Sequence, residues 1–207
     1  MEIVPIKYAE SVLSENQIFM GGDKNTYRPI VFVLYLIKTA SRTILVDAGC
    51  DTMPGFDMKN FIGPVKALAK VNVSPEDISD VIITHAHHDH IDAVRHFNRA
   101  LIHIQRDEFQ AGKTYIPDGF RVNLFDDEFL LCPGVRVIKI GGHTAGSCIV
   151  EITSNNKTYI ISGDECYLKE CLTNKVVTGS SACPEKSKAF IEKYSASKYT
   201  VLMCHDT

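Results

Sequence analysis

The sequence predicts a layered α/β protein in which short β-strands alternate with helices around a buried core. Two observations predict this fold class. Short apolar runs such as Ile30–Ile37 recur along the chain and are typical of buried strands. Helix-start signals stand between them, as at Ser74-Pro75-Glu76-Asp77 and at Pro184. Strands interspersed with helices favour a layered α/β architecture.

The expected elements follow from these signals in chain order. Each expected strand is a short apolar run; the expected strands span 2–7, 30–37, 42–47, 80–84, 101–104, 121–125, 135–140, 147–153, 157–162 and 199–203. Ser74 is a typical N-cap, Pro75 lies in the first turn, and Asp77 stands three residues after the cap, while Pro184 opens the last helix. The expected helices span 59–71, 74–78, 90–97, 106–112 and 184–195.

Length and composition indicate a single domain over residues 1–207. The chain has 207 residues, of which 45% are hydrophobic, enough for one full core. Its net charge of −3 implies no general attraction to nucleic acid, and no apolar run reaches membrane-spanning length. The seven cysteines are scattered and the N-terminus lacks signal-peptide features, so we expect reduced thiols and a cytoplasmic protein. The oligomeric state leaves no signal in the sequence.

The densest group of candidate functional residues lies between Thr84 and Asp92. It has the spacing H-x-H-x-D-H, with His85, His87, Asp89 and His90 at the ligand positions. Imidazole and carboxylate groups suit zinc, iron or manganese. The group follows one expected strand and precedes a helix, which places it at a strand's carboxyl end. Residues two apart in an extended segment point the same way, so the first two histidines should face one metal and the later pair a second.

Three isolated candidates come later in the chain, and each follows an apolar run. They are His143, Asp164 and His205, after the runs that end near residues 140, 161 and 203. Together with the first four they make seven ligands, enough for two metal ions that share one of them. His88 fills a spacer position, and His96 and His103 lack ligand neighbours, so we expect no metal role for these three.

With these motifs the chain resembles the metallo-β-lactamase superfamily of metal-dependent hydrolases. The matching residues are Thr84–His90, Gly142-His143-Thr144, Gly163-Asp164 and Cys204-His205, with Leu45-Val46-Asp47-Ala48-Gly49 as an early strand end. The similarity spans about residues 30 to 206. It implies a four-layer αββα sandwich, the metallo-β-lactamase fold.

The resemblance also implies a role for each candidate. Two divalent metal ions are expected, zinc first, with iron or manganese as alternatives. The first metal takes His85, His87 and His143, the second takes Asp89, His90 and His205, and Asp164 bridges both. The resemblance implies that Asp47 does not bind a metal itself but orients the imidazole of a ligand. Asp89 and Tyr167 are the residues we assign to catalysis.

Within the superfamily the complete ligand set resembles glyoxalase II-type thioesterases and acyl-homoserine lactone lactonases. Tyr167 stands three residues after Asp164, where lactonases of this type have a tyrosine that contacts the substrate carbonyl. The chain departs from the lactonase-like pattern at two places that bear on which substrate it binds. His88 stands where the lactonase-like pattern usually has an aromatic residue, and Ile91-Asp92 stands where small residues are common.

These features predict a hydrolase that cleaves the carbonyl bond of a lactone, thioester or ester in a small acyl substrate. A metal-bridging hydroxide would attack, so no side-chain nucleophile is needed, and no G-x-S-x-G elbow is present. We expect no role for Cys166 or Cys204, although both adjoin ligands. Loops 15–28, 51–64 and 112–120 are the candidate pocket walls.

Two alternatives stay open at this point. A persulfide dioxygenase-like oxidoreductase needs only one iron, for which His85, His143 and Asp164 would be enough; the second ligand set argues against it. Flavodiiron proteins are a weaker match, because they typically have a glutamate where this chain has His87. The other alternative is a metal-binding protein without catalytic activity.

Overall fold

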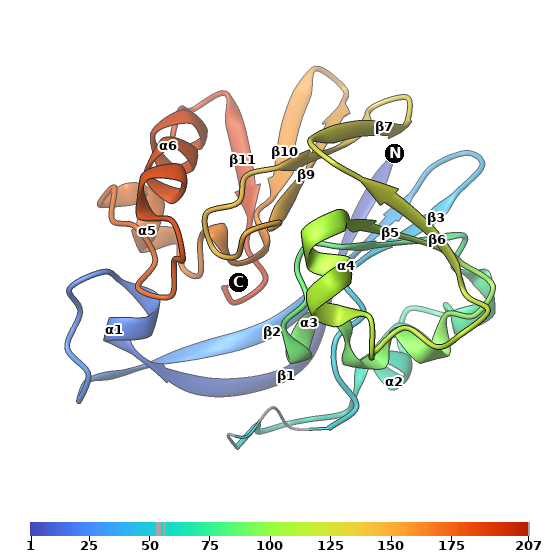
Figure 1. Cartoon of the computed structure of the whole chain (residues 1–207), viewed down its shortest axis with the longest axis horizontal. Coiled ribbons are helices and arrows are strands. Elements are labelled where there is room, and N and C mark those ends of the chain that lie inside the picture. Colours follow the sequence, from blue (N-terminus) through green and yellow to red (C-terminus); the bar gives the residue numbers. More distant parts are fainter. Residues whose placement is uncertain (53–54, 56, 207) are drawn as a thin grey trace. The chain divides into compact units, whose positions relative to one another are not determined.

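The computed structural model describes residues 1–52, 55 and 57–206, and its chain divides into two compact units. Unit 1 comprises Met1–Glu10 and Phe32–Phe125, and unit 2 comprises Ser11–Val31 and Asp126–Thr207. Figure 1 shows the helices and strands of both units. In the part of the chain that is described, no helix is both long and apolar enough to cross a membrane.

The first sheet carries most of unit 1 and has the strand order β1-β2-β3-β4-β5-β6. Its strands are β1 (Glu2–Ser14), β2 (Tyr27–Lys38), β3 (Thr43–Val46), β4 (Asp80–Ile83), β5 (Leu101–Gln105) and β6 (Arg121–Phe125). Strands β2 and β3 are antiparallel, whereas β3 to β6 are parallel. All four residues of β4 are buried, which explains its continuous apolar run. The carboxyl ends of β3 and β4 therefore lie at the same edge.

The helices of unit 1 are short. They are α2 (Pro64–Ala69), α3 (His88–Ile91) and α4 (Arg106–Gly112), with 3₁₀ turns at Pro75–Asp77 and Asp92–His96. The predicted capping box is present, because the Asp77 carboxylate accepts from both the backbone N–H and the hydroxyl of Ser74, each at 2.8 Å. The helix expected over 59–71 begins only at Pro64, after Gly63 with its left-handed φ of 74°.

The second sheet lies in unit 2 and has the strand order β11-β10-β9-β8-β7. Its strands are β7 (Glu128–Cys132), β8 (Val135–Lys139), β9 (Cys148–Ser154), β10 (Lys157–Ile161) and β11 (Tyr199–Leu202). Neighbours from β7 to β10 are antiparallel, and β10 and β11 are parallel. Strands β8, β10 and β11 consequently run the same way, and their carboxyl ends share one edge.

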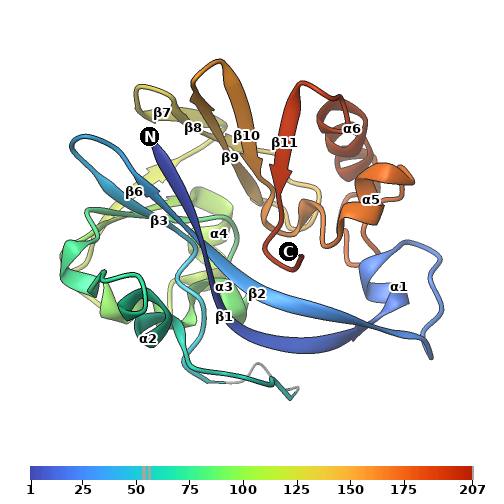
Figure 2. The same ribbon diagram turned by 180° about the vertical axis from the view of Figure 1, so that it is seen from behind.

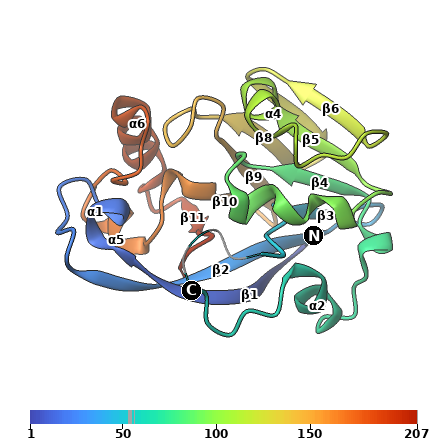
Figure 3. The ribbon, with the colours of Figure 1, turned by 60° about the horizontal axis from the view of Figure 1, so that its bottom comes forward.

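The helices of unit 2 are α1 (Glu15–Ile18), α5 (Lys169–Thr173) and α6 (Pro184–Tyr194), with a 3₁₀ turn at Gly163–Glu165. Pro184 opens α6 as predicted, and the helix buries Ser187, Phe190, Ile191 and Tyr194, the spacing of one helical face. Figure 2 shows α6 beside β11, where the Tyr194 and Tyr199 rings meet with centroids 4.9 Å apart. Figure 3 shows α1 beside α5, where the Cys171 thiol donates to the Ile18 carbonyl at 3.8 Å.

The structure differs from the expected elements at other places too, and the helix expected over 90–97 is the short α3 followed by the 3₁₀ turn Asp92–His96. Strand β1 continues to Ser14 instead of ending at residue 7, and β7, α1 and α5 were not predicted. β7 is an edge strand whose Leu130 is 66% exposed, so its short apolar run Phe129–Cys132 does not mark a buried strand. α1 and α5 have four and five residues, too few for a helical period to show.

A buried polar cluster around Asp80 ties together the strands of unit 1. The Asp80 carboxylate accepts from His103 Nε2 at 2.9 Å, from Ser79 Oγ at 2.7 Å and from the Arg42 guanidinium at 2.8 Å. Burial raises the pKa of Asp80, but these hydrogen bonds and the Arg42 charge outweigh it and hold the pKa at about 2. His103 also meets Asn123 at 3.1 Å, so this histidine serves the cluster.

Asp80→Asn is expected to lower the free energy of unfolding at neutral pH by about 1–2 kcal/mol, because the amide carries no charge to pair with Arg42. The loss is no larger than this because the Arg42 side chain is partly exposed and water screens its charge. The folded pKa of about 2 lies below the ordinary value of 3.8, so this stability is present above about pH 4 and is lost as pH falls toward 2. Urea unfolding of both proteins between pH 7 and pH 2 measures it. The difference in unfolding free energy between Asp80→Asn and wild type should therefore shrink as pH falls toward 2. The exposed Asp118→Asn control should be as stable as wild type at every pH.

Candidate metal centre

The H-x-H-x-D-H segment lies at the carboxyl edge of β3 and β4 in unit 1. Asp47 directly follows β3 and has a left-handed φ of 61°, and its backbone N–H donates to the Ile82 carbonyl at 2.8 Å. The N–H of Ala48 donates to the His90 carbonyl at 2.7 Å. The loop that carries the histidines is thus held against the end of the neighbouring strand.

The carboxylate of Asp47 sets the proton positions of two ligand-type histidines. It is fully buried and accepts from Thr84 N at 2.7 Å, Thr84 Oγ1 at 2.9 Å and His90 Nδ1 at 2.8 Å. His90 therefore carries its proton on Nδ1, which leaves Nε2 as its candidate metal-binding nitrogen. Since the Thr84 hydroxyl donates to Asp47, its oxygen accepts from His85 Nδ1 at 3.1 Å, which leaves Nε2 of His85 as the second such nitrogen.

The atoms of unit 1 that could ligate a metal lie close together in two pairs. His85 Nε2 and His87 Nδ1 lie 3.1 Å apart, with ring centroids separated by 4.6 Å. Asp89 Oδ2 lies 3.6 Å from His90 Nε2. The His85 and His90 rings are also close, with centroids 4.0 Å apart, so the division of these ligands between two metals stays a prediction.

Three further residues of unit 1 hold this loop and were missed in the sequence. Glu108 is buried and accepts the N–H of Ala86, which stands between His85 and His87, at 2.8 Å. The Tyr8 hydroxyl donates to the Asp89 carbonyl at 2.9 Å. A Cβ on Gly112 would lie 2.8 Å from the Ala86 Cβ, so only glycine fits there. These residues are distant in sequence, and no motif links them to the ligands.

The histidines without an expected metal role have other contacts. His88 Nε2 lies 2.9 Å from the Thr52 carbonyl oxygen, and its Nδ1 lies 3.3 Å from the Tyr115 hydroxyl. His96 is exposed and pairs with Asp51 at 2.6 Å. Each histidine thus has polar partners of its own.

In unit 2, one carboxylate faces two imidazoles. Asp164 Oδ1 lies 3.1 Å from His205 Nε2, and Asp164 Oδ2 lies 3.6 Å from His143 Nε2; all three side chains are buried. His205 Nδ1 donates to the Val31 carbonyl at 3.0 Å, so a neutral ring points its Nε2 lone pair at the carboxylate oxygen. A cation beside both atoms relieves their repulsion, and two carboxylate oxygens facing different imidazoles suit a bridging ligand. The donor set fits divalent metal ions.

The aromatic residue predicted near this carboxylate lies against both histidines of unit 2. The Tyr167 ring stacks on His205 with a centroid separation of 5.0 Å and an interplanar angle of 19°. Its centroid lies 6.1 Å from that of His143, edge to face. The neighbouring Cys166 is fully buried, its thiol donates to the Leu168 carbonyl at 3.2 Å, and the Cys171 thiol and burial raise its pKa. A protonated, buried thiol suits packing and not nucleophilic attack.

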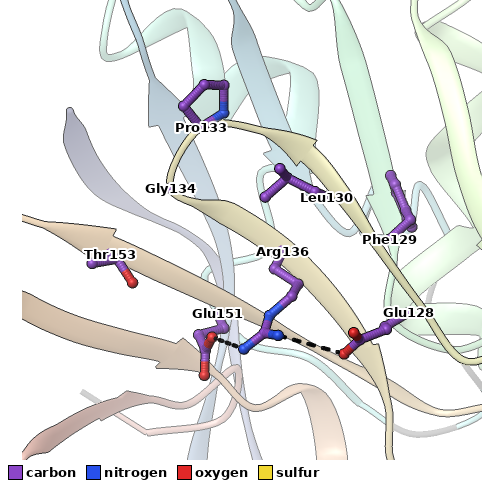
Figure 4. A pocket seen from close by; sticks show the side chains of 8 residues that line it. All are labelled: Glu128, Phe129, Leu130, Pro133, Gly134, Arg136, Glu151 and Thr153. Atoms are coloured by element: carbon purple, nitrogen blue, oxygen red, sulfur yellow. Dashed lines mark hydrogen bonds and ion pairs between the residues drawn. The ribbon is translucent and has the colours of Figure 1, made fainter.

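A cavity of about 770 Å³ opens on β7, β8 and β9 of unit 2 (Figure 4). Arg136 lies in it between Glu151, at 2.6 Å, and Glu128, at 3.6 Å. None of the seven candidate ligands and none of the three predicted wall loops lines it. The wall loops therefore stay a prediction, and three residues of the loop 51–64, at positions 53, 54 and 56, lie outside the described residues.

Sequence comparison matches residues 33–185 to the family model described as the metallo-beta-lactamase superfamily. A probable metallo-hydrolase of Methanocaldococcus jannaschii is 35% identical over 113 residues, which are 55% of this chain and 48% of that protein. The chain thus spans about half the length of this relative. The N-acyl homoserine lactonase AiiB of Agrobacterium fabrum is 23% identical over 209 residues, covering 81% of this chain and 76% of that protein.

Solved structures establish the fold. A quorum-quenching N-acyl homoserine lactone lactonase has a TM-score of 0.86 at 21% identity, covering 99% of this chain and 91% of its own. AidC, a dizinc quorum-quenching lactonase in complex with a product, has a TM-score of 0.80 at 19% identity, covering 99% and 87%. The predicted fold class, with two sheets and helices of the αββα type, is confirmed by this likeness.

Proposed function

Because the chain belongs to the metallo-beta-lactamase superfamily, we propose that it is a binuclear metal-dependent hydrolase that cleaves the carbonyl bond of a lactone, thioester or ester. The observation that carries the proposal is the donor set. Unit 1 presents two pairs of ligand atoms at one strand edge, and unit 2 presents a carboxylate between two imidazoles.

In this proposal the ligands of both units serve one centre. His85, His87 and His143 would hold the first metal, Asp89, His90 and His205 would hold the second, and Asp164 would be a ligand to both. The family match runs across both units, which supports a single domain over 1–207. Imidazole and carboxylate donors suit zinc, and AidC is named as a dizinc enzyme, so zinc is the metal we place there first.

When bound, the metals lower the pKa of a coordinated water toward about 7 and polarise the substrate carbonyl. The protein's own groups orient this chemistry. Asp47 and Thr84 orient His90 and His85 so that each ring carries its proton on Nδ1 and uses Nε2 as the ligating nitrogen. We assign to the Tyr167 hydroxyl a hydrogen bond to the substrate carbonyl and to the oxyanion that develops from it, and the contacts of its ring with His143 and His205 support this role. Asp89 would be a metal ligand that takes up the proton lost by the attacking water and passes it to the leaving oxygen or sulfur.

A lactone is the substrate class that we place first. AiiB and the N-acyl homoserine lactonase of Bacillus cereus, which is 26% identical over 167 residues, support this choice, as does the stacked Tyr167. The substrate is then a small acylated molecule. A cytoplasmic location stays a prediction. The single-iron oxidoreductase is not favoured, because it leaves the Asp89–His90 pair without a role.

Metal analysis and a substrate screen test the proposal together. Elemental analysis of protein purified without added metal should give about two equivalents per chain. The metallated protein should hydrolyse at least one member of a panel of acyl-homoserine lactones, thioesters and esters, followed with a pH indicator, and chelation should abolish the activity. About one equivalent of iron with oxygen uptake on a persulfide would instead move the assignment to a dioxygenase. Two bound metals with no turnover on any panel member would contradict the hydrolase.

A further inference from the structure

A buried glutamate, Glu165, lies at the centre of a hydrogen-bond network in unit 2. It follows Asp164 in the 3₁₀ turn Gly163–Glu165 and is fully buried. Its Oε1 accepts from the backbone N–H groups of Gly142 and His143, at 3.0 and 3.1 Å, and from Ser147 Oγ at 2.5 Å. Its Oε2 accepts from Ser187 Oγ at 3.1 Å. Burial raises the pKa of Glu165, and these hydrogen bonds oppose the rise.

The loop that carries His143 is packed tightly around this carboxylate. A Cβ on Gly142 would lie 2.3 Å from Glu165 Oε2 and 2.3 Å from Ser187 Oγ, so the close approach requires glycine. From the other side, the Gly142 carbonyl accepts from Cys183 N at 2.8 Å and from Ser181 Oγ at 2.9 Å. The loop is therefore held between Glu165 and the start of α6, and a displaced glutamate would leave two backbone N–H groups unsatisfied.

We infer that Glu165 is a positioning residue that fixes the His143 imidazole relative to the Asp164 carboxylate. The inference rests on the proposed function, in which both residues are metal ligands. Glu165 is joined to Asp164 through the backbone and holds His143 through that residue's N–H, so one side chain links ligands from two strand ends. The 3.6 Å separation of His143 Nε2 and Asp164 Oδ2 depends on this link.

Two substitutions separate the hydrogen-bond acceptor from the bulk of the side chain. Glu165→Gln keeps an oxygen for the three donors at Oε1, and its amide NH₂ can donate to Ser187 Oγ. Glu165→Leu has a similar size but accepts nothing. Zinc affinity is measured by competition with a chromogenic chelator, and coordination geometry by the visible spectrum of the Co²⁺-substituted protein. Glu165→Leu should lose about 10–100-fold in affinity and change the Co²⁺ spectrum, as residues that orient ligands do. Glu165→Gln should stay within about threefold of wild type.

Zinc affinity also provides the control and the results that would contradict the inference. The exposed Glu185→Gln, a matched change in α6, should bind zinc like wild type. If thermal unfolding of the metal-free protein shows that Glu165→Leu does not fold, Ser147→Ala tests the inference in its place. This variant removes one hydrogen-bond donor to Glu165 Oε1 and should weaken zinc binding about 3–10-fold. Unchanged affinity in the folded variant, or equal losses in the Gln and Leu variants, would overturn the inference. A wild-type protein that binds no metal would instead overturn the proposed function.

Discussion

Asp164→Asn is expected to lower kcat/KM by about 10³-fold or more and to reduce bound metal from two equivalents to about one. The two oxygens of Asp164 face different imidazoles, at 3.1 and 3.6 Å. An amide keeps the shape but replaces one oxygen with an NH₂ group that cannot ligate and places a donor where a cation should lie. The metals lose their shared ligand, and their mutual distance is no longer fixed. Elemental analysis and steady-state kinetics on the best substrate of the panel measure both effects.

The control for this variant is Asp127→Asn, an exposed residue at which the same chemical change should leave metal content and rate unchanged. Circular dichroism of Asp164→Asn should match wild type, because the side chain is isosteric. A variant that retains two metals and more than about a tenth of the wild-type rate would show that Asp164 does not bridge.

The sequence predicts where the candidate ligand segments stand in the fold, because each segment is local and follows a strand. Strands β8, β10 and β11 run in one direction, and β3 and β4 are parallel, so residues placed just after them gather at one edge of each sheet. His143, Asp164 and His205 could therefore be grouped without a structure. The same reasoning found the start of α6 and the capping box at Ser74, which are local signals too.

The residues that hold the ligand loops could not be predicted in this way. Glu108 accepts from the backbone N–H of Ala86, and Glu165 accepts from that of His143, in each case 22 residues away in the sequence. Every residue except proline has such an N–H group, so the acceptor cannot be assigned from the sequence. A buried glutamate looks like a surface glutamate in a single sequence. What distinguishes Glu165 is the close approach of Gly142, and that is visible only once the fold brings the two together.

Asp47→Asn is expected to weaken both metal sites while leaving the fold intact. Asparagine tolerates the left-handed φ of 61° at this position, and its Oδ1 can still accept from Thr84 N. Its NH₂ group, however, now faces Thr84 Oγ1 and His90 Nδ1, where the carboxylate accepted. A donor facing Nδ1 favours the tautomer with its proton on Nε2, the nitrogen proposed to bind the second metal.

The change also passes through Thr84 to the first metal. Once the Thr84 oxygen accepts from the new amide, its hydroxyl is free to donate to His85 Nδ1, which shifts that ring to the Nε2-protonated tautomer as well. We therefore expect zinc affinity to fall about 10–100-fold at each site, with the free energy of unfolding of the metal-free protein lowered by only about 1 kcal/mol. Chelator competition measures the affinities, and long-range ¹⁵N–¹H NMR of the histidine rings reports the tautomers.

Asp47→Ala separates the tautomer effect from loss of structure. Alanine removes three hydrogen bonds to a buried carboxylate and has no side-chain group to compensate a left-handed backbone, so it should lower the free energy of unfolding by about 3–5 kcal/mol. If Asp47 only supported the fold, the two variants would lose metal affinity in proportion to their stability. If Asp47 instead sets which ring nitrogens of His85 and His90 carry the proton, Asp47→Asn will lose metal affinity while its stability stays almost unchanged. In that variant the ring protons move to Nε2, but the backbone at the end of β3 keeps its position.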